Sequence, residues 1–367
     1  MNVLVLKPGQ HHLGYACMPG VRLGPVVAGR IEDYRGHDTG VDGLARVRQQ
    51  IRGSGRVGGP AGSMDAIAIR VTFGGSIFDG PRVVSADVLG RLEALVPHAP
   101  LHLPPVLGLI RRCHKVFAGV PIVLVFETAF FAGLPPREHL YGVDTNLTQS
   151  PGLRRYGFHG LFHEAACARV ARDWRAARTI QSVRVLSVCL EPSPEVAAAL
   201  GNRPMMVTGG ATPLEGILGQ TTCGQIDPSI VLALAREMAW GPEQINTVLT
   251  QQSGLRGLLG RPSTLEEVFN SGLDDAQRAC DILRYRILQA CGAGIATMGG
   301  VDTIVFSGRF VRVGDMLGPW LASRLVFKGR PPRRKIPWQC MTESLDRIIA
   351  DAATAALLAG RRLPNAG

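Results

Sequence analysis

Arg70 is the residue whose setting most directly suggests chemistry, because it interrupts the apolar, β-like run Ala66–Thr72. An arginine on a buried strand needs an anionic partner, so this position indicates either a bound anion or a structural ion pair. The adjacent His11 and His12 could bind a metal ion, but no third ligand stands at a useful spacing, which disfavours a metal site. The residue pattern therefore directs attention to an anion at Arg70.

The glycine-rich segment Gly53–Gly62 contains the spacing GxGxxG that is typical of dinucleotide-binding loops. In such loops a buried strand precedes the glycines and a helix follows them. Here the polar segment Arg46–Arg52 precedes them, and Pro60 stands where the helix should begin. We interpret this segment as a flexible connection and not as a nucleotide site.

The chain has 367 residues and a formal charge of 40 − 29 = +11, and this length predicts two domains. No apolar stretch approaches the roughly 20 residues of a membrane span, and the N-terminus lacks the form of a secretory signal. We therefore expect a cytoplasmic protein with no membrane partner.

The eight cysteines show no CxxC spacing and are expected to be buried, reduced thiols. A basic cluster lacks interleaved aromatic residues and is interpreted as a solvated loop, not as a nucleic-acid site; it comprises Arg330, Arg333, Arg334 and Lys335.

Strands and helices that alternate along the chain must position these groups. Strand-like segments are Val3–Leu6, Ala66–Thr72, Ile122–Phe126, Val183–Leu190 and Thr303–Ser307. Helical patterns cover Asp87–Val96, Val106–Phe117, His163–Arg172, Pro228–Met238, Asp275–Met298 and Ser344–Ala359. Alternation of this kind predicts an α/β architecture. The pattern restarts after the Pro/Gly-rich region Gly133–Pro151, which indicates a second α/β domain.

The stretch LRRYGFHGLFH, Leu153–His163, closely resembles the signature of the acetate kinase family. Seven further blocks resemble motifs of that family in the same order, namely IRVTFGG at Ile69–Gly75, APLHLPP at Ala99–Pro105, VFETAFF at Val125–Phe131, TPLEG at Thr212–Gly216, CGQIDPS at Cys223–Ser229, SGLRGLLG at Ser253–Gly260 and MGGVDTIVFSG at Met298–Gly308. The resemblance implies the α/β fold of acetate and sugar kinases, Hsp70 and actin, with two RNase-H-like lobes and a central cleft. The implied lobes are residues 1–131 with 345–367, and residues 132–344.

Kinases of this family transfer the γ-phosphoryl group of ATP to a carboxylate with the help of Mg²⁺ and form an acyl phosphate. The resemblance implies catalytic roles for Arg70, His159 and Glu127, the last standing where the family has an aspartate. It also implies a substrate pocket, made of Thr72, Leu101, His102, Phe158 and Pro213. Thr72 replaces a valine and would admit a more polar acyl group.

Several of these residues have a second interpretation that is purely structural. His102 could cap a helix, and His159 could be a hydrogen-bonded core histidine. Leu101, Phe158 and Pro213 are expected to be core residues under either interpretation.

The nucleotide side departs from the family pattern at both phosphate loops. The family's NAGSSSLK loop is replaced by Lys7–Gly14, and its HLGNG turn by Cys189–Ser193. In the second loop Glu191 would repel a phosphate, and Pro192 lacks a backbone N–H. These changes predict weakened binding of the ATP phosphates.

Three further positions bear on the nucleotide and the metal. Thr222 stands where the family has its second active-site arginine, and the nucleoside turn GIGEN aligns with Gly308–Arg312. The cations that could still bind ATP phosphates near these positions are Lys7, Arg309 and Arg312. Glu127 and Glu343 are the carboxylates that could bind Mg²⁺.

We therefore expect a divergent member of the acetate kinase family that keeps part of a pocket for a short-chain carboxylate or acyl phosphate. ATP-dependent phosphoryl transfer is expected to be weakened or lost. One alternative is an active short-chain carboxylate kinase of the acetate or propionate type, with ATP and Mg²⁺. The other is a non-catalytic binding or scaffold protein without a cofactor, because fold alone does not decide function.

The resemblance also implies a homodimer that pairs through the second lobe. The helical pattern Asp275–Met298 is apolar on more than one side. Such a helix can be covered by its own sheet and by a second subunit together.

Overall fold

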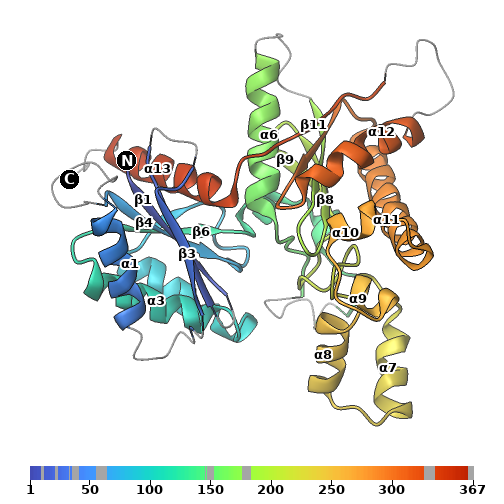
Figure 1. The fold of residues 1–367 in the computed structure, drawn as a ribbon, viewed down its shortest axis with the longest axis horizontal. Helices are drawn as coiled ribbons and strands as arrows, with labels where there is room; N and C mark the ends of the chain where they lie inside the picture. Colours follow the sequence, from blue (N-terminus) through green and yellow to red (C-terminus); the bar gives the residue numbers. More distant parts are fainter. Residues whose placement is uncertain are drawn as a thin grey trace. The chain divides into compact units, whose positions relative to one another are not determined.

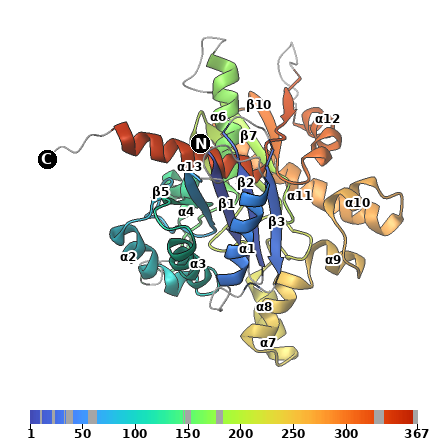
Figure 2. The same ribbon diagram turned by 60° about the vertical axis from the view of Figure 1, so that its left-hand side comes forward.

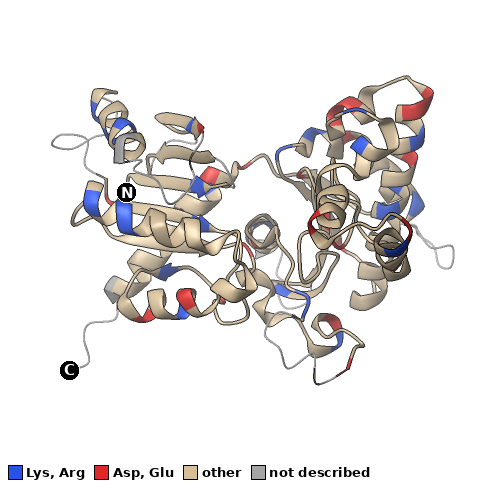
Figure 3. Cartoon of the chain, turned by 90° about the horizontal axis from the view of Figure 1, so that it is seen from below, with Lys and Arg blue, Asp and Glu red and all other residues tan. Residues whose placement is uncertain are grey.

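A computed structural model of the chain describes residues 1–9, 12–20, 24–32, 34, 41–54, 64–144, 146, 153–175, 183–325 and 335–362. The chain forms two compact units, Met1–Ala132 with Glu343–Gly367, and Gly133–Thr342 (Figure 1). Among the described residues, no helix has the length and apolar content to cross a bilayer. Basic and acidic residues are interspersed within each unit (Figure 3).

The first unit is built on a six-stranded sheet with the order β3-β2-β1-β4-β6-β5. Its strands are β1 Val3–Pro8, β2 His12–Met18, β3 Val27–Glu32, β4 Ala66–Val71, β5 Arg82–Val83 and β6 Ile122–Phe126. The first three strands are antiparallel, whereas β1, β4 and β6 run parallel to one another. All five residues of β6 are buried, as expected for a parallel strand covered on both faces.

Helices cover the two faces of this sheet (Figures 1 and 2). They are α1 Val41–Gly53, α2 Ala86–Ala94, α3 Leu103–Val116 and α13 Leu345–Arg362, with the short turns η1 Val96–His98 and η2 Ala129–Gly133. The C-terminal α13 packs against β1, β4 and β6, whereas α1 and α3 pack against each other. Helix α3 begins at Leu103, three residues before the predicted Val106, because Pro104 and Pro105 are compatible with a first helical turn.

The second unit repeats this topology in a five-stranded sheet with the order β11-β10-β7-β8-β9. Its strands are β7 Arg184–Cys189, β8 Glu195–Leu200, β9 Arg203–Val207, β10 Thr303–Ser307 and β11 Trp338–Cys340. Strands β7, β8 and β9 are antiparallel, and β7, β10 and β11 are parallel. The two sheets thus share one strand order, and the predicted α/β fold with two RNase-H-like lobes is confirmed.

The helices of the second unit include one long element that organises its core. They are α4 Pro136–His139, α6 Gly160–Arg175, α7 Pro228–Glu237, α8 Pro242–Gln251, α9 Gly254–Leu259, α10 Leu265–Asn270, α11 Asp274–Met298 and α12 Gly314–Arg324, with η3 Val311–Val313. Helix α11 packs on β7, β8 and β9, and α6 packs on β7 and β10. A Cβ atom on Gly294 of α11 would lie 2.8 Å from a methyl carbon of Leu186, so this glycine allows the helix to approach the sheet closely.

The packing of α11 predicts different costs for two isoleucines on the same helix. Ile287 is 0% exposed and Ile282 is 40% exposed. Ile287→Ala should lower the free energy of unfolding by about 2–5 kcal/mol, because it removes buried methyl groups and leaves a cavity. Ile282→Ala should lower it by less than about 1 kcal/mol. Urea unfolding of both variants measures the difference, and equal losses would contradict this packing.

Candidate functional site

The candidate site of the first unit lies at the carboxyl ends of its parallel strands. Arg70 is near the end of β4, and Glu127 directly follows β6. Because β4 and β6 pair in parallel, these ends meet at the same edge of the sheet. Nε of Arg70 lies 2.5 Å from Oε1 of Glu127. The anionic partner expected for Arg70 is therefore, within this unit, a carboxylate of the chain itself.

Glu127 is held in a buried position but is only half paired. Its side chain is 2% exposed, and its backbone N–H donates to the carbonyl of Val71 over 2.9 Å. None of the described residues donates a hydrogen bond to its second oxygen, Oε2. A buried carboxylate oxygen without a donor is costly, so this atom is suited to a cation or a donor from a ligand.

A small pocket lies beside Arg70. Its lining includes Pro8 and Gly9 from the end of β1, Thr72 after β4, and Leu101 and His102 before α3. The pocket thus places Thr72, Leu101 and His102, three of the five substrate-pocket residues that the resemblance implied, beside the catalytic candidate Arg70. The other two, Phe158 and Pro213, belong to the second unit.

The structural interpretations of the candidate substrate residues are met only in part. His102 is the N-cap residue of α3, but its side chain makes no capping hydrogen bond. Leu101 is 63% exposed and Pro213 is also exposed, so neither is a core residue. Phe158 is only partly buried. Leu101 and Pro213 lie on the surface of their own units because their segments are connections between secondary-structure elements.

Lys7, a candidate phosphate ligand, pairs within the first unit as well. Its ammonium group forms an ion pair with Oδ1 of Asp346 in α13, and the side chains are 27% and 19% exposed. Lys7 and Pro8 extend β1 and pair with Gly14 and Leu13 of β2. The charge of Lys7 is therefore neutralised by Asp346, a residue that is distant from it in the sequence.

In the second unit, the segment RYGFHG is anchored by a buried carboxylate, Glu195. The backbone N–H of His159 donates to its Oε1 over 3.0 Å, and that of Phe158 to its Oε2 over 3.2 Å. Nε2 of His163 lies 3.3 Å from Oε1. Burial raises the pKa of Glu195, but the hydrogen bond from His163, the charges of both histidines and the amide of His159 outweigh it and hold the pKa below its usual value.

Sequence reasoning missed Glu195, although a signal was present. It is the charged residue at the start of EVAAAL, β8, and is 4% exposed. A carboxylate that begins an otherwise apolar strand has to find donors, and the nearest are in the RYGFHG segment.

The imidazole of His159 contacts the loop that joins β7 to β8. Its Nε2 lies 3.1 Å from the carbonyl oxygen of Ser193. The hydroxyl of Ser193 lies 3.0 Å from that of Thr222, and the N–H of Gln220 donates to the carbonyl of Pro192 over 2.6 Å. The replaced phosphate turn is therefore bonded directly to the segment that carries the replaced arginine position.

Arg309, the second substitute cation, is bound to the same loop. Its backbone N–H donates to Oε1 of Glu191 over 2.7 Å, and its Nε lies 3.1 Å from Oε2. Glu191, expected to repel phosphate, instead has an internal partner.

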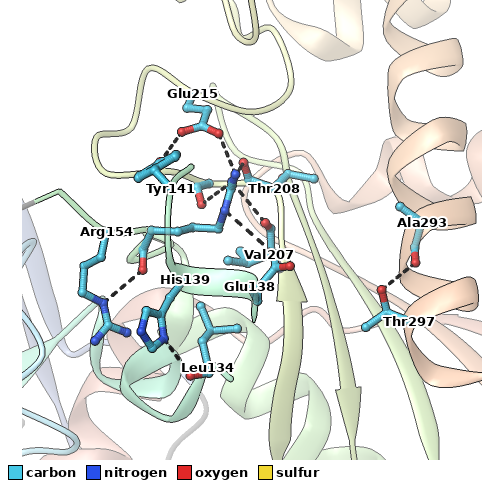
Figure 4. Close-up of polar contacts among 12 residues, drawn as sticks. Leu134, Glu138, His139, Tyr141, Arg154, Val207, Thr208, Glu215, Ala293 and Thr297 are labelled. Atoms are coloured by element: carbon cyan, nitrogen blue, oxygen red, sulfur yellow. Dashed lines mark hydrogen bonds and ion pairs between the residues drawn. The ribbon is translucent and has the colours of Figure 1, made fainter. Parts of the chain in front are cut away.

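Arg155, the first residue of RYGFHG, donates its hydrogen bonds to other groups of the second unit. Its Nη1 donates to the carbonyls of Thr208 and Gly209, over 3.0 and 3.1 Å, and its Nη2 donates to Glu215 over 2.7 Å. Figure 4 shows Glu215 beside Tyr141, and the hydroxyl of Tyr141 also donates to Glu215. This network ties the RYGFHG segment to the end of β9.

Other candidate residues carry less structural information. Glu343 is partly exposed. Within the described ranges, no group of three or more His, Cys, Asp and Glu side chains could hold a metal ion. His11 and most of Gly53–Gly62 lie outside the described residues, as do Arg330, Arg333 and Arg334.

The surroundings of His102 generate a testable prediction. Desolvation and the positive charge of Arg70 lower the pKa of its imidazole. The unfolded chain therefore binds this proton at a higher pH, and the stability that the neutral ring contributes declines as the pH falls through about 6.5.

NMR titration of His102 should give a pKa below its usual value, and Arg70→Gln should raise it. Arg111→Gln, which changes a 71% exposed arginine of the same unit, should leave it unchanged. An ordinary pKa in the parent chain would contradict the proximity of the two side chains.

Comparisons with known proteins match the chain to one family. A family model described as the acetokinase family matches residues 34–314. The chain is 32% identical over 270 residues to an acetate kinase of Thermoanaerobacter pseudethanolicus, covering 72% of this chain and 67% of that protein. It is 37% identical over 244 residues to an acetate kinase of Clavibacter michiganensis, covering 66% and 61%. The match thus spans about two thirds or less of each relative's length.

Solved structures resemble the whole chain in fold. A Porphyromonas gingivalis acetate kinase superimposes with a TM-score of 0.85 at 24% identity, over 97% of this chain and 99% of that one. A Francisella tularensis propionate kinase gives 0.82 at 23% identity, over 96% and 98%. Motifs, topology and sequence identity together show that this chain belongs to the acetokinase family.

Proposed function

We propose that this chain is a divergent acetokinase-family protein that binds a short-chain carboxylate or acyl phosphate, with weakened or lost ATP-dependent transfer to the carboxylate. One contrast carries this proposal. On the carboxylate side the buried Oε2 of Glu127 has no donor among the described residues, whereas on the nucleotide side both oxygens of Glu191 accept from Arg309 and Thr222 hydrogen-bonds to Ser193.

The proposed anion site centres on the guanidinium of Arg70. Its side chain is 26% exposed, and Nε is its atom in contact with Glu127. The two terminal nitrogens have no hydrogen-bond partner among the described residues and border the pocket with Thr72 and His102. A guanidinium fork of this kind suits the paired oxygens of a carboxylate or phosphate, and the Thr72 hydroxyl favours a polar acyl group.

Mg²⁺, which the family implies, fits part of this site. The buried Oε2 of Glu127 has no donor, and Mg²⁺ prefers carboxylate oxygens. Glu343 is the second carboxylate we propose for it. When bound, Mg²⁺ would neutralise negative charge on phosphate oxygens. The role of Glu127 itself is to supply that oxygen and to fix Arg70.

The residues on the other side do not fit ATP phosphates in the way the family pattern requires. Arg309 is paired with Glu191, and Thr222 hydrogen-bonds to Ser193 where the family has an arginine. Loss of one preorganised transition-state donor commonly costs about 2.7–4 kcal/mol, so two such losses would reduce transfer severely.

An active short-chain carboxylate kinase is the second candidate. It is favoured by His159, whose backbone is fixed by Glu195 and whose imidazole hydrogen-bonds to the Ser193 carbonyl. The relatives named as acetate and propionate kinases also favour it. In this case Arg70 and His159 would stabilise the transferred group. A non-catalytic binding or scaffold role is the third candidate.

We also propose a homodimer formed through the second unit. Helix α11 leaves Tyr285 56% exposed and Ile282 40% exposed, and α7 has no buried residue although Leu232 and Ile230 are large and apolar. Pairing of two copies would remove such exposed apolar side chains from water, which supports the proposal.

Separate calorimetric titrations with acetyl phosphate and with Mg-ATP test the proposed function. Acetyl phosphate should bind, Arg70→Ala should abolish the binding, and the control Arg111→Ala should retain it. The Kd of Mg-ATP should be higher than about 1 mM. Acetyl phosphate formation at roughly 1–100 s⁻¹ would reject the weakened-transfer proposal in favour of the active kinase.

Light scattering at micromolar concentration tests the dimer, which should have twice the chain mass of 39.3 kDa. Tyr285→Asp should shift it toward the monomer, because a carboxylate would be buried in an apolar interface. Ile77→Asp, at a 38% exposed position of the first unit, should not. A parent protein with the mass of one chain would refute the proposal.

A further inference from the structure

We infer that Glu191 is a built-in anion that occupies the donors of the turn after β10, so that a nucleotide phosphate meets a position already filled by the chain. This inference rests on the proposed weakness of ATP binding and gives it a specific cause. It makes Glu191 a specificity-determining residue that acts by exclusion.

The contact has the form of an anion site. Both oxygens of Glu191 are used, one by the backbone N–H of Arg309 at 2.7 Å and one by Nε of the same residue at 3.1 Å. Glu191 is 7% exposed, whereas the side chain of Arg309 is 63% exposed. A backbone N–H beside a guanidinium is the donor set that proteins commonly offer to phosphate, and here a carboxylate takes it.

The backbone fixes this carboxylate against the turn. Gly308 has a φ of +94°, and a Cβ atom there would lie 2.7 Å from the carbonyl oxygen of Leu190. The N–H of Phe310 donates to that carbonyl over 3.0 Å, and the N–H of Leu190 donates to Ser307 over 2.8 Å. The two turns are thus in direct contact, and the backbone N–H groups of two successive residues, Arg309 and Phe310, are satisfied by residues 190 and 191.

The loop between β7 and β8, which carries Glu191, is also hydrogen-bonded to the segment around Thr222. Ser193 hydrogen-bonds to Thr222, and the carbonyl of Pro192 accepts from Gln220. Both pairs, Glu191 with Arg309 and Ser193 with Thr222, join a residue of the replaced phosphate turn to another position that departs from the family pattern. The departures therefore complement each other, as expected of an arrangement that is stable without a nucleotide.

Removal of the negative charge should open the site to nucleotides. Glu191→Gln keeps an oxygen that can accept from the Arg309 amide, so the loop should fold as before. The positive charge of Arg309 is then no longer neutralised by a carboxylate at Nε, and the repulsion of phosphate is removed. The Kd of Mg-ATP, measured by calorimetry on the full chain, should fall at least tenfold. In the double variant Glu191→Gln with Arg309→Ala, the gain should disappear.

Glu237→Gln serves as the matched control, because Glu237 is an exposed residue of α7 in the same unit. Melting temperatures of all variants establish that they are folded. An equal gain in Glu237→Gln would assign the effect to net charge and overturn the inference. No gain in a folded Glu191→Gln would also overturn it, while the proposed function would stand. Micromolar binding by the parent chain would overturn both.

Discussion

Burial of a charged carboxylate is the constraint on which the second unit depends. Glu195 is removed from water at the start of β8 and needs donors from outside its strand. The N–H groups of Phe158 and His159 and the ring of His163 meet this need, and the same contacts fix the start of α6 and the backbone of His159. A Cβ atom on Gly209 would lie 1.9 Å from Oε2 of Glu195, so the end of β9 also has to accommodate this carboxylate. The geometry of the RYGFHG segment is thus a consequence of one buried charge.

The fold could be predicted from the sequence because the helices and strands are encoded in local patterns of apolar residues. The apolar spacing of Leu283, Ile287 and Gly294 marks the face of α11 that packs on the sheet, and the continuous apolar run of β6 marks a strand buried on both faces. The pattern alone predicted two α/β domains, and the resemblance to the family added that both have an RNase-H-like topology. Boundaries shifted where a local rule was stronger than periodicity, as at the prolines that begin α3.

The site was less predictable, because its decisive contacts join distant segments. Glu191 and Arg309 are separated by 118 positions, and each was assigned a role toward phosphate without reference to the other. Lys7 likewise pairs with Asp346 of the C-terminal helix. A residue type predicts the charge that a position offers, but only the fold determines whether a partner already neutralises it. The +11 net charge therefore does not translate into free cations at these positions.

Glu127 of the first unit and Glu191 of the second differ in how many of their carboxylate oxygens are hydrogen-bonded. Glu127 receives Arg70 at one oxygen and none of the described donors at the other. Glu191 receives donors at both oxygens. Because an unpaired buried oxygen is costly, the first arrangement becomes more stable when a cation or ligand is added, whereas the second would have to lose bonds to admit one. Two carboxylates in units of the same topology thus have opposite effects: one favours a ligand, and the other takes a ligand's place.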